Sequence, residues 1–377
     1  MRRILLALLA AELLLQLVRP TLLDRVRQRA FNVSGDDADF VTLQPLNFDP
    51  ATRLPLLVYD PDAFWVMAPD RQGAYFLTAE VRTNALGLRG PPLVPRAGDD
   101  EIRLLFLGDS VTFGMRVGES ERYADVLVEA LRAEAPGLSF TAVNAGVIGY
   151  SVTQVLTRLP DWLQAAQPDV VLVALGLNDC LLLPASDAQL RSETTSTWER
   201  LRHAARASQL VCSLEVAVAW LQREGASLAT DRRRPVAHWL HYPRLPSGST
   251  RVPRTSGEDF FAALEEIERL CSACGATLVL VTEHASPEVP STRLPDPDWF
   301  ERLGGLCASL REHAARRGLV LADARAALGR SPKAPQELML DFCHPSPAGH
   351  AVMAAELDRT LETSGLLARW RQRAERR

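Results

Sequence analysis

The apolar residues of this chain alternate between short continuous runs and longer runs at helical spacing. Residues 102–107 (IRLLFL) form a near-continuous apolar run, which is typical of a strand buried on both faces. Apolar side chains then recur through 120–133 at the spacing of one helix face. The same alternation predicts further strands at 140–143, 170–175, 277–282 and 319–322, and further helices at 152–166, 260–271, 299–316 and 347–361.

Strands that alternate with helices predict an α/β fold, here a parallel sheet of five strands with helices on both faces. The alternation stops between 180 and 257. A helical pattern at 190–221 is followed there by a stretch rich in Pro, Arg and aromatic residues at 232–254. We therefore interpret 101–363 as one domain with a helical insertion at 180–257, in a position where it could act as a lid.

The segments on either side of this domain have a different character. Residues 24–100 contain short apolar pieces between Pro and Asp residues, which predict an irregular β-containing segment. Strands are expected at 41–43, 56–59 and 75–81, and a linker at 91–100. Five arginines mark 364–377 as a basic C-terminal tail, which we interpret as a solvated helix end.

The first 23 residues have the layout of an export signal, because Met1 and two arginines precede an apolar run from Ile4 to Val18. No A-x-A cleavage site follows, so we expect an uncleaved signal anchor at 1–23, with the bulk of the chain on the extracytoplasmic side of a membrane. Cleavage would instead give a secreted protein. An amphipathic soluble helix is the alternative.

Composition narrows the classes of partner and cofactor. The net charge is −4, whereas a nucleic-acid-binding protein usually carries a basic surplus, so we expect no nucleic-acid partner. The six cysteines include no paired C-x-x-C motifs, and the chain has no H-E-x-x-H. We therefore expect neither a disulfide scaffold nor a zinc site, and no metal or organic cofactor.

Polar residues follow the strands at the edge where a parallel sheet collects its functional groups. Ser110, at the end of Gly108-Asp109-Ser110, would be an exposed nucleophile at the turn into a helix. Gly146 follows the second strand and can bring its N–H close to a ligand, and Asn178 after the third can donate its amide to a developing oxyanion. Taken singly, a helix cap or an ordinary turn explains each of these residues better.

Asp341 and His344 lie three residues apart on the loop after the last strand. His344 would take the proton of Ser110, while Asp341 would hold the imidazole tautomer and stabilise its charged form. A surface aspartate beside an unrelated histidine is the alternative. The joint pattern is more specific than any single residue, because it supplies a nucleophile, a base, an acid and two oxyanion donors.

In these blocks the chain resembles the SGNH hydrolases, also called GDSL esterases, over about residues 101–361. The matching blocks are Gly108-Asp109-Ser110, Gly146, Gly176-Leu177-Asn178-Asp179 and the D-x-x-H from Asp341 to His344. The resemblance implies a three-layer, flavodoxin-like fold, a triad of Ser110, His344 and Asp341, and an oxyanion hole from Ser110, Gly146 and Asn178. The stretch 83–90 (TNALGLRG) also resembles the lead-in of bacterial exported members.

The residues and the resemblance together predict a serine esterase that hydrolyses acyl esters, with a short-chain, acetyl or glycan ester as substrate. A sugar hydroxyl in place of water would make it an O-acyltransferase acting on an extracytoplasmic glycan. A non-catalytic, membrane-tethered protein that binds a glycan or lipid is the rival, favoured if the His344 ring lies beyond about 3.5 Å from the Ser110 hydroxyl. Cys180 and Cys343 flank the blocks and are a candidate disulfide for an exported protein.

Overall fold

The computed structural model describes residues 2–18, 56–60, 62–71, 74–76, 79–98, 100–183, 185–193, 251–289, 296 and 298–375. The chain divides into two compact units, one of 1–66 with 190–244 and one of 67–189 with 245–377. The second unit contains the parallel sheet and every predicted site residue.

The described part of the first unit contains a helix, a hairpin that ends at the unit's boundary, and residues 190–193. Strands β1 (Leu57–Asp60) and β2 (Phe64–Met67) form the hairpin. In its turn, the Asp60 carboxylate accepts the backbone N–H groups of Asp62 and Ala63 at 2.9 and 2.7 Å. β1 confirms the strand predicted at 56–59, whereas 41–43 lies outside the described residues.

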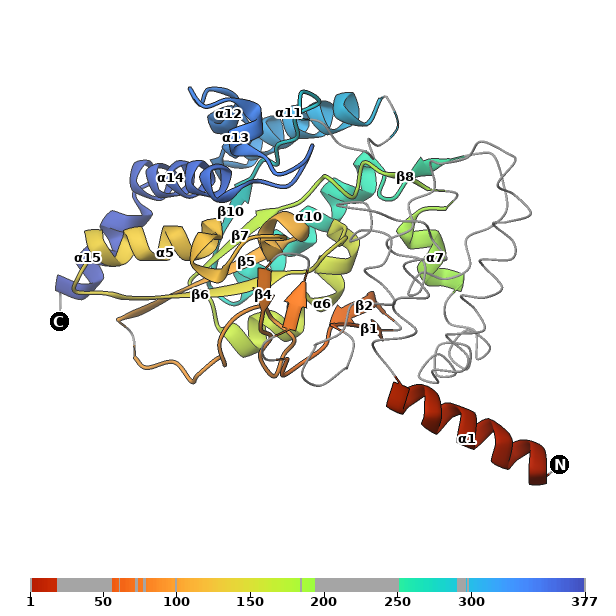
Figure 1. Cartoon of the computed structure of the whole chain (residues 1–377). Coiled ribbons are helices and arrows are strands. Elements are labelled where there is room, and N and C mark those ends of the chain that lie inside the picture. The colour runs from red at the N-terminus through yellow and green to blue at the C-terminus, as the bar shows by residue number, and fades with distance from the viewer. Residues whose placement is uncertain are drawn as a thin grey trace. The chain divides into compact units, whose positions relative to one another are not determined.

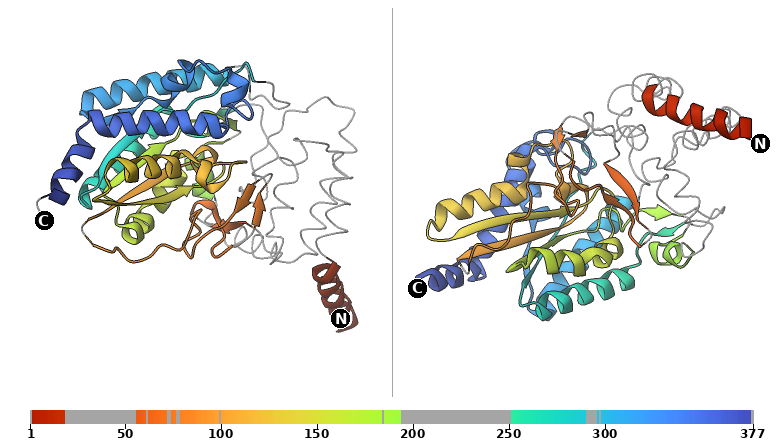
Figure 2. Two further views of the ribbon diagram at one scale, coloured as in Figure 1. Left: turned by 60° about the vertical axis from the view of Figure 1, so that its left-hand side comes forward. Right: turned by 90° about the horizontal axis from the view of Figure 1, so that it is seen from below.

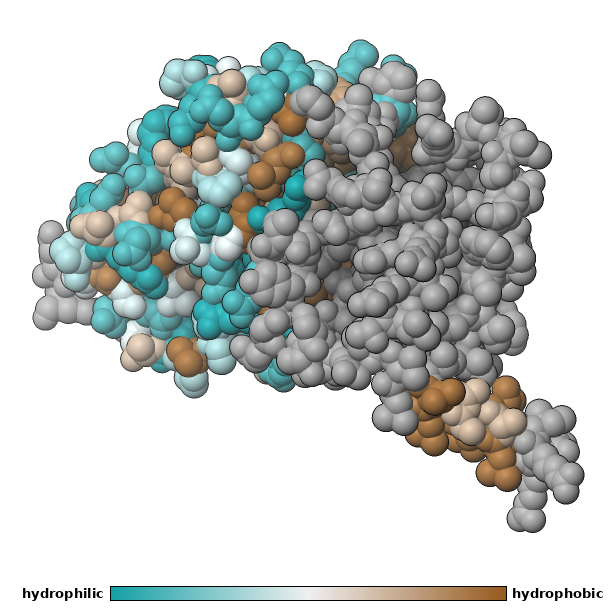
Figure 3. Space-filling model, in the orientation of Figure 1, coloured by the Kyte–Doolittle hydropathy of each residue, from teal (hydrophilic) through white to brown (hydrophobic). Residues whose placement is uncertain are grey.

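Helix α1 (Arg2–Val18) is the helical part of the predicted signal anchor. It exposes a row of leucines, brown in Figure 3: Leu6, Leu8, Leu9, Leu13 and Leu14. Among the described residues, no helix combines the length and the apolar character that a membrane crossing requires. The transmembrane anchor predicted at 1–23 therefore has no support in the structure.

The centre of the second unit is a parallel sheet of the five strands that the apolar runs predict. They are β5 (Glu101–Gly108), β6 (Ser139–Gly146), β7 (Val170–Ala174), β10 (Thr277–Val281) and β11 (Val320–Ala322). Their order is β11-β10-β7-β5-β6. The strand order reverses at β5 and β7, so the carboxyl ends of these strands form the switch point where doubly wound sheets bind ligands.

Helices cover both faces of the sheet, as predicted (Figures 1 and 2). On one face lie α5 (Tyr123–Glu134), α11 (Trp299–Arg317) and α14 (Pro347–Thr363), and on the other lie α6 (Val152–Ala166) and α10 (Gly257–Ala273). Alternate strand residues such as Leu104, Phe106 and Leu172 share one apolar core with α5, α11 and α14. The result is the expected three-layer α/β fold.

Several short elements escape the sequence pattern because they hold too few residues to show a period. They are α4 (Ser110–Phe113), the 3-10 turn η1 (Glu119–Glu121), α12 (Ala324–Gly329) and α13 (Pro335–Leu338). The single strand predicted at 75–81 is instead a hairpin of β3 (Ala74–Phe76) and β4 (Ala79–Val81).

The insertion predicted at 180–257 is described only near its two ends. β8 (Leu182–Leu183) and β9 (Val252–Pro253) pair antiparallel, and α7 (Asp187–Glu193) follows β8. The remainder of the helix predicted at 190–221, and most of 232–254, lie outside the described residues.

The predicted basic tail is a helix that packs on the domain. α15 (Leu366–Glu375) buries Leu366, Leu367 and Trp370, and the Trp370 ring meets Phe140 of β6 edge-on at 6.1 Å. The expected solvated end is therefore wrong for these three side chains. The high number of arginines favoured a solvated helix, although apolar residues alternate with the charged ones and form a buried face.

Candidate active site

The turn after β5 both caps a helix and presents Ser110. Asp109 is the N-cap of α4, and its Oδ1 accepts the backbone N–H of Val111 at 2.8 Å. Ser110 is the first residue of α4 and keeps 8% of its surface exposed. The two interpretations of this block are thus compatible, because the aspartate supplies the cap and the serine remains free to react.

His344 lies beside the Ser110 hydroxyl. Its Nε2 is 2.9 Å from Ser110 Oγ, and its Nδ1 is 2.8 and 2.9 Å from the two oxygens of Asp341. Asp341 Oδ1 also accepts the backbone N–H groups of Cys343 and His344, at 2.9 and 2.8 Å. These local bonds make the D-x-x-H loop a rigid turn that presents the acid and the base together.

The charge of Asp341 controls the protonation of His344. Burial by itself lowers the pKa of His344, but the charge and the hydrogen bond of Asp341 outweigh it, so that the pKa lies above its usual 6.5. Burial would raise the pKa of Asp341, and the His344 imidazole with two backbone N–H groups instead holds it well below its usual range. The pair is therefore suited to accept a proton at the imidazole while the carboxylate stays ionised.

The Asn178 side chain is held in place by Asp109. Asn178 Nδ2 donates to Asp109 Oδ2 at 2.6 Å, which uses one of the two N–H groups of the amide. The other N–H has no hydrogen-bond partner in the described part of the chain and can serve a substrate oxygen. Asp109 therefore contacts both the helix that carries the nucleophile and the loop that carries the predicted oxyanion donor.

Gly146, the predicted second oxyanion donor, has a different role. Its N–H donates to Asn144 Oδ1 at 3.0 Å, and a Cβ on this residue would lie 2.2 Å from the backbone nitrogen of Phe113. Gly146 thus lets α4 pack tightly on β6, and its N–H is already taken up by the Asn144 side chain. The expectation that it forms the oxyanion hole is not met by this geometry.

Gly149, three residues further along the loop, is a candidate backbone donor that the sequence pattern did not single out. Its φ of 77° lies in the left-handed region that favours glycine. Its carbonyl is held by Arg254 Nη1 at 2.7 Å, while its N–H has no hydrogen bond within the described residues. The loop begins beside the nucleophile turn, because Val147 N–H donates to the carbonyl of Gly108 at 3.1 Å.

A buried ion pair ties this loop to the ends of the insertion. Arg254 and Asp187 are 1% and 0% exposed, and Arg254 Nη2 lies 2.8 Å from Asp187 Oδ2. The same Arg254 nitrogen donates to Gln154 Oε1 at 2.6 Å, and Ser151 Oγ donates to Asp187 Oδ2 at 2.6 Å. The insertion is therefore anchored at its base by charge, directly beside the Gly149 loop.

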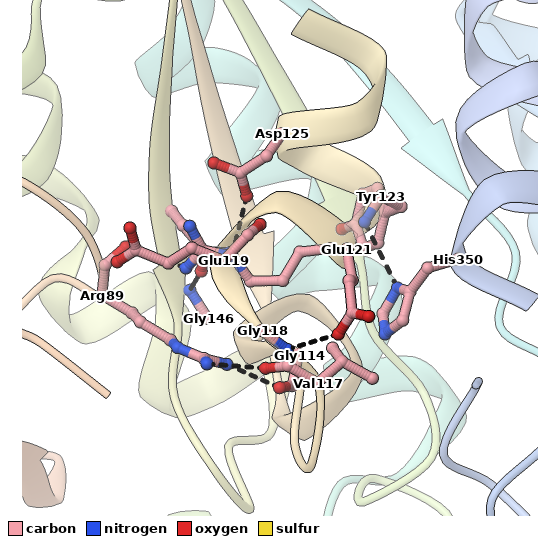
Figure 4. Close-up of polar contacts among 12 residues, drawn as sticks. Arg89, Gly114, Val117, Gly118, Glu119, Glu121, Tyr123, Asp125, Gly146 and His350 are labelled. Carbon is pink, nitrogen blue, oxygen red and sulfur yellow. Dashed lines mark hydrogen bonds and ion pairs between the residues drawn. The ribbon is translucent and has the colours of Figure 1, made fainter. Parts of the chain in front are cut away.

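A second buried arginine supports the chain just after the nucleophile (Figure 4). Arg89 Nη1 donates to the carbonyls of Phe113 and Gly114 at 2.5 Å, and its Nη2 donates to that of Val117 at 2.8 Å. Burial, with the nearby charge of Arg122, lowers the pKa of Arg89 to about 9, so the guanidinium stays charged at neutral pH. Arg89 belongs to the predicted lead-in at 83–90, and this contact gives that stretch a structural role.

The cysteines near the site are free thiols. Cys180 and Cys343 are both unpaired and buried, so the disulfide expected between them is not formed. Cys343 Sγ lies 3.5 Å from His344 Nδ1, and with Asp341 these side chains form the one three-residue group of potential metal ligands found in the described residues. The imidazole and the carboxylate of this group already bind each other.

Comparison with known proteins supports the family resemblance of this domain. The model of the GDSL-like lipase/acylhydrolase family matches residues 106–242, which include Ser110 and Asn178. An arylesterase from Vibrio mimicus is 35% identical over 79 residues, covering 21% of this chain and 38% of that protein. Thioesterase 1/protease 1/lysophospholipase L1 of Escherichia coli K12 is 38% identical over 78 residues, 21% of this chain and 35% of that protein. The match thus spans little more than a third of these relatives.

Two solved structures cover more of the chain at lower similarity. An α/β hydrolase enzyme from the metagenome of Lake Arreo is 20% identical, with a TM-score of 0.43 over 71% of this chain and 96% of that one. An acetylxylan esterase from Geobacillus stearothermophilus is 18% identical, with a TM-score of 0.43 over 69% of this chain and 94% of that one.

The family match covers the nucleophile turn and the Asn178 loop, and the tertiary structure brings the Asp341–His344 loop to the same serine from beyond the matched segment. The resemblance to the SGNH hydrolases is thereby confirmed. Residues 106–242 of the chain match the GDSL-like lipase/acylhydrolase family.

Proposed function

We propose that this protein is a serine esterase that cleaves acyl esters with Ser110 as its nucleophile. The observation that carries the proposal is the continuous chain of contacts from Ser110 Oγ to His344 Nε2 at 2.9 Å, and from His344 Nδ1 to Asp341 at 2.8 Å. This arrangement of nucleophile, base and carboxylate activates a hydroxyl for attack on a carbonyl.

The reaction proceeds in two steps. His344 Nε2 takes the hydroxyl proton as Ser110 Oγ attacks the ester carbonyl, and the imidazolium then gives that proton to the departing alcohol, leaving an acyl group on Ser110. Water, deprotonated by His344, then attacks the acyl group, and the imidazolium returns that proton to Ser110 Oγ as the acid leaves. The N–H groups of Ser110 and Gly149 and the Asn178 amide stabilise the oxyanion of each tetrahedral intermediate. Gly149 takes the place in which Gly146 was expected.

Two relatives support this class of reaction, since they are named an arylesterase and a thioesterase/lysophospholipase. A binding protein would need no base against Ser110, so the 2.9 Å contact favours catalysis over the non-catalytic alternative.

The acceptor of the acyl group distinguishes an esterase from an O-acyltransferase. Measuring free acid against acylated sugar, with an acetyl donor and an added glycan, separates the two.

The proposal is tested with a fluorophosphonate probe and p-nitrophenyl acetate. Wild-type protein should be labelled and should release acetate. Ser110→Ala should abolish labelling and lower kcat by about 10³-fold or more, because the nucleophile is absent. Ser364→Ala at the C-cap of α14 is the matched control and should behave as wild type. Equal rates for Ser110→Ala and wild type would refute the proposal.

A further inference from the structure

A second carboxyl group is buried directly against the nucleophile turn. Glu283 lies two residues after β10 and is 1% exposed. Its Oε2 accepts the backbone N–H of Leu177 at 2.9 Å, and its carboxyl group lies close to the fully buried carboxyl group of Asp109. Its Oε1 has no N–H or hydroxyl donor among the described residues. None of the catalytic steps above uses this side chain.

Two carboxyl groups in contact at a buried position cannot both be ionised, because each charge is poorly solvated and repels the other. The titratable groups that interact with the pair are mostly acidic or neutral: Asp179, Tyr123, Cys180, Cys307, Cys343 and His344. Burial and the charge of Asp109 raise the pKa of Glu283 well above its usual value. Burial and mutual repulsion therefore favour a state in which one of the two carboxyl groups keeps its proton.

The hydrogen bonds decide which carboxyl group holds the proton. Asp109 accepts two N–H groups, from Val111 at 2.8 Å and from the Asn178 amide at 2.6 Å. Glu283 accepts only the N–H of Leu177. Because hydrogen bonds from N–H groups stabilise the ionised form, Asp109 is the carboxylate and Glu283 the acid. A proton on Oε1 also explains why that oxygen meets no donor.

We propose that Glu283 is a positioning residue: a neutral acid that donates its proton to Asp109 and holds the Leu177–Asn178 loop, so that the Asn178 amide is directed at the oxyanion of the reaction. The inference rests on the proposed esterase function. Through Leu177 it fixes the backbone of the loop, and through Asp109 it fixes one N–H of the amide. The second N–H of Asn178 is then left for the substrate.

The matched pair of variants is Glu283→Gln and Glu283→Leu. A glutamine can donate an amide N–H to Asp109 and accept the Leu177 N–H, so it reproduces both contacts without a titratable proton. A leucine fills the space but offers neither contact. We expect Glu283→Gln to keep kcat and KM within about threefold of wild type. Glu283→Leu should lower kcat by about 10- to 100-fold at little-changed KM, because one oxyanion donor loses its orientation.

The shared proton has its own spectroscopic readout. The infrared difference spectrum of wild type minus Glu283→Gln at neutral pH should contain the C=O band of a protonated carboxylic acid that shifts in D₂O. An ionised carboxylate band in its place would overturn the proposal, and so would a loss of kcat in Glu283→Gln as large as that in Glu283→Leu. This measurement needs no activity and remains decisive if Glu283→Leu does not fold.

Failure of the two proposals can be told apart. If wild type neither labels with the fluorophosphonate nor hydrolyses the ester, the esterase function fails while the infrared band still reports the buried acid. If wild type is active, Ser110→Ala is inactive and Glu283→Leu retains full kcat, then only the positioning role of Glu283 is wrong.

Discussion

The backbone N–H of Gly146 donates to the side-chain oxygen of Asn144 at 3.0 Å. The amide nitrogen of Asn144 in turn donates to the carbonyl of Thr112 at 2.7 Å. Asn144 therefore joins the end of β6 to the helix that carries Ser110. Gly146, which the motif predicted as an oxyanion donor, serves packing. In the proposed mechanism, Asn178 and the Gly149 N–H stabilise the oxyanion instead.

Two asparagine-to-alanine variants separate these roles. Asn144→Ala should lower the free energy of unfolding by about 1–3 kcal/mol, because it leaves a buried carbonyl and N–H unpaired. Asn178→Ala should change stability less but lower kcat by about 10²–10³-fold through loss of an oxyanion donor. Urea unfolding and ester hydrolysis measure the two effects. A larger loss of kcat in folded Asn144→Ala than in Asn178→Ala would contradict the assignment.

The acid limb of the pH–rate profile should report His344. Activity requires the neutral imidazole, and Asp341 holds the pKa of His344 above its usual 6.5. Activity should therefore fall as the pH drops, with its midpoint above pH 6.5. In Asp341→Asn the burial of the ring acts without the carboxylate charge, so the midpoint should move to lower pH while kcat falls by about 10⁴-fold. An unchanged midpoint in this variant would show that another group controls the limb.

Breaking the ion pair beneath the Gly149 loop should destabilise the fold strongly. Arg254→Met leaves Asp187 charged and buried, so we expect a loss of about 3–5 kcal/mol in the free energy of unfolding. Adding Asp187→Asn should restore much of that loss, because no buried charge remains unpaired. Arg269→Met, which removes an exposed partner of Glu266, should change stability little. Denaturant unfolding of the four proteins tests the comparison.

Arg89 should be needed for the structure of the chain after the nucleophile. Arg89→Met removes the donors of three buried carbonyls, at Phe113, Gly114 and Val117, so we expect a loss of at least about 2 kcal/mol. Arg89→Lys keeps the charge but cannot reach all three carbonyls, so its loss of stability should be intermediate. Arg82→Met, at a partly exposed ion pair with Glu119, should cost less than about 1 kcal/mol. Similar losses for the methionine variants of Arg89 and Arg82 would argue against the role given to Arg89.

The sheet and its helices could be predicted because their signal is local. Buried strands such as β5 are continuous apolar runs, and helices such as α6 repeat apolar residues at three and four positions. The triad was predictable for the same reason, since Ser110 follows a strand and the D-x-x-H loop closes on itself through bonds between neighbours. Elements shorter than two helical turns, such as α4, carry no such period.

The amino-acid sequence by itself therefore indicated the α/β fold, the family resemblance and the three residues of the proposed triad. Only the tertiary structure decided which groups the residues around the triad contact. It turned the Gly146 N–H toward Asn144, kept Cys180 and Cys343 apart as thiols, and buried Glu283 against Asp109, 174 residues away in sequence. The physical reason is that hydrogen bonds and charge pairs between distant segments depend on how the strands order themselves in the sheet, which leaves no periodic trace along the chain.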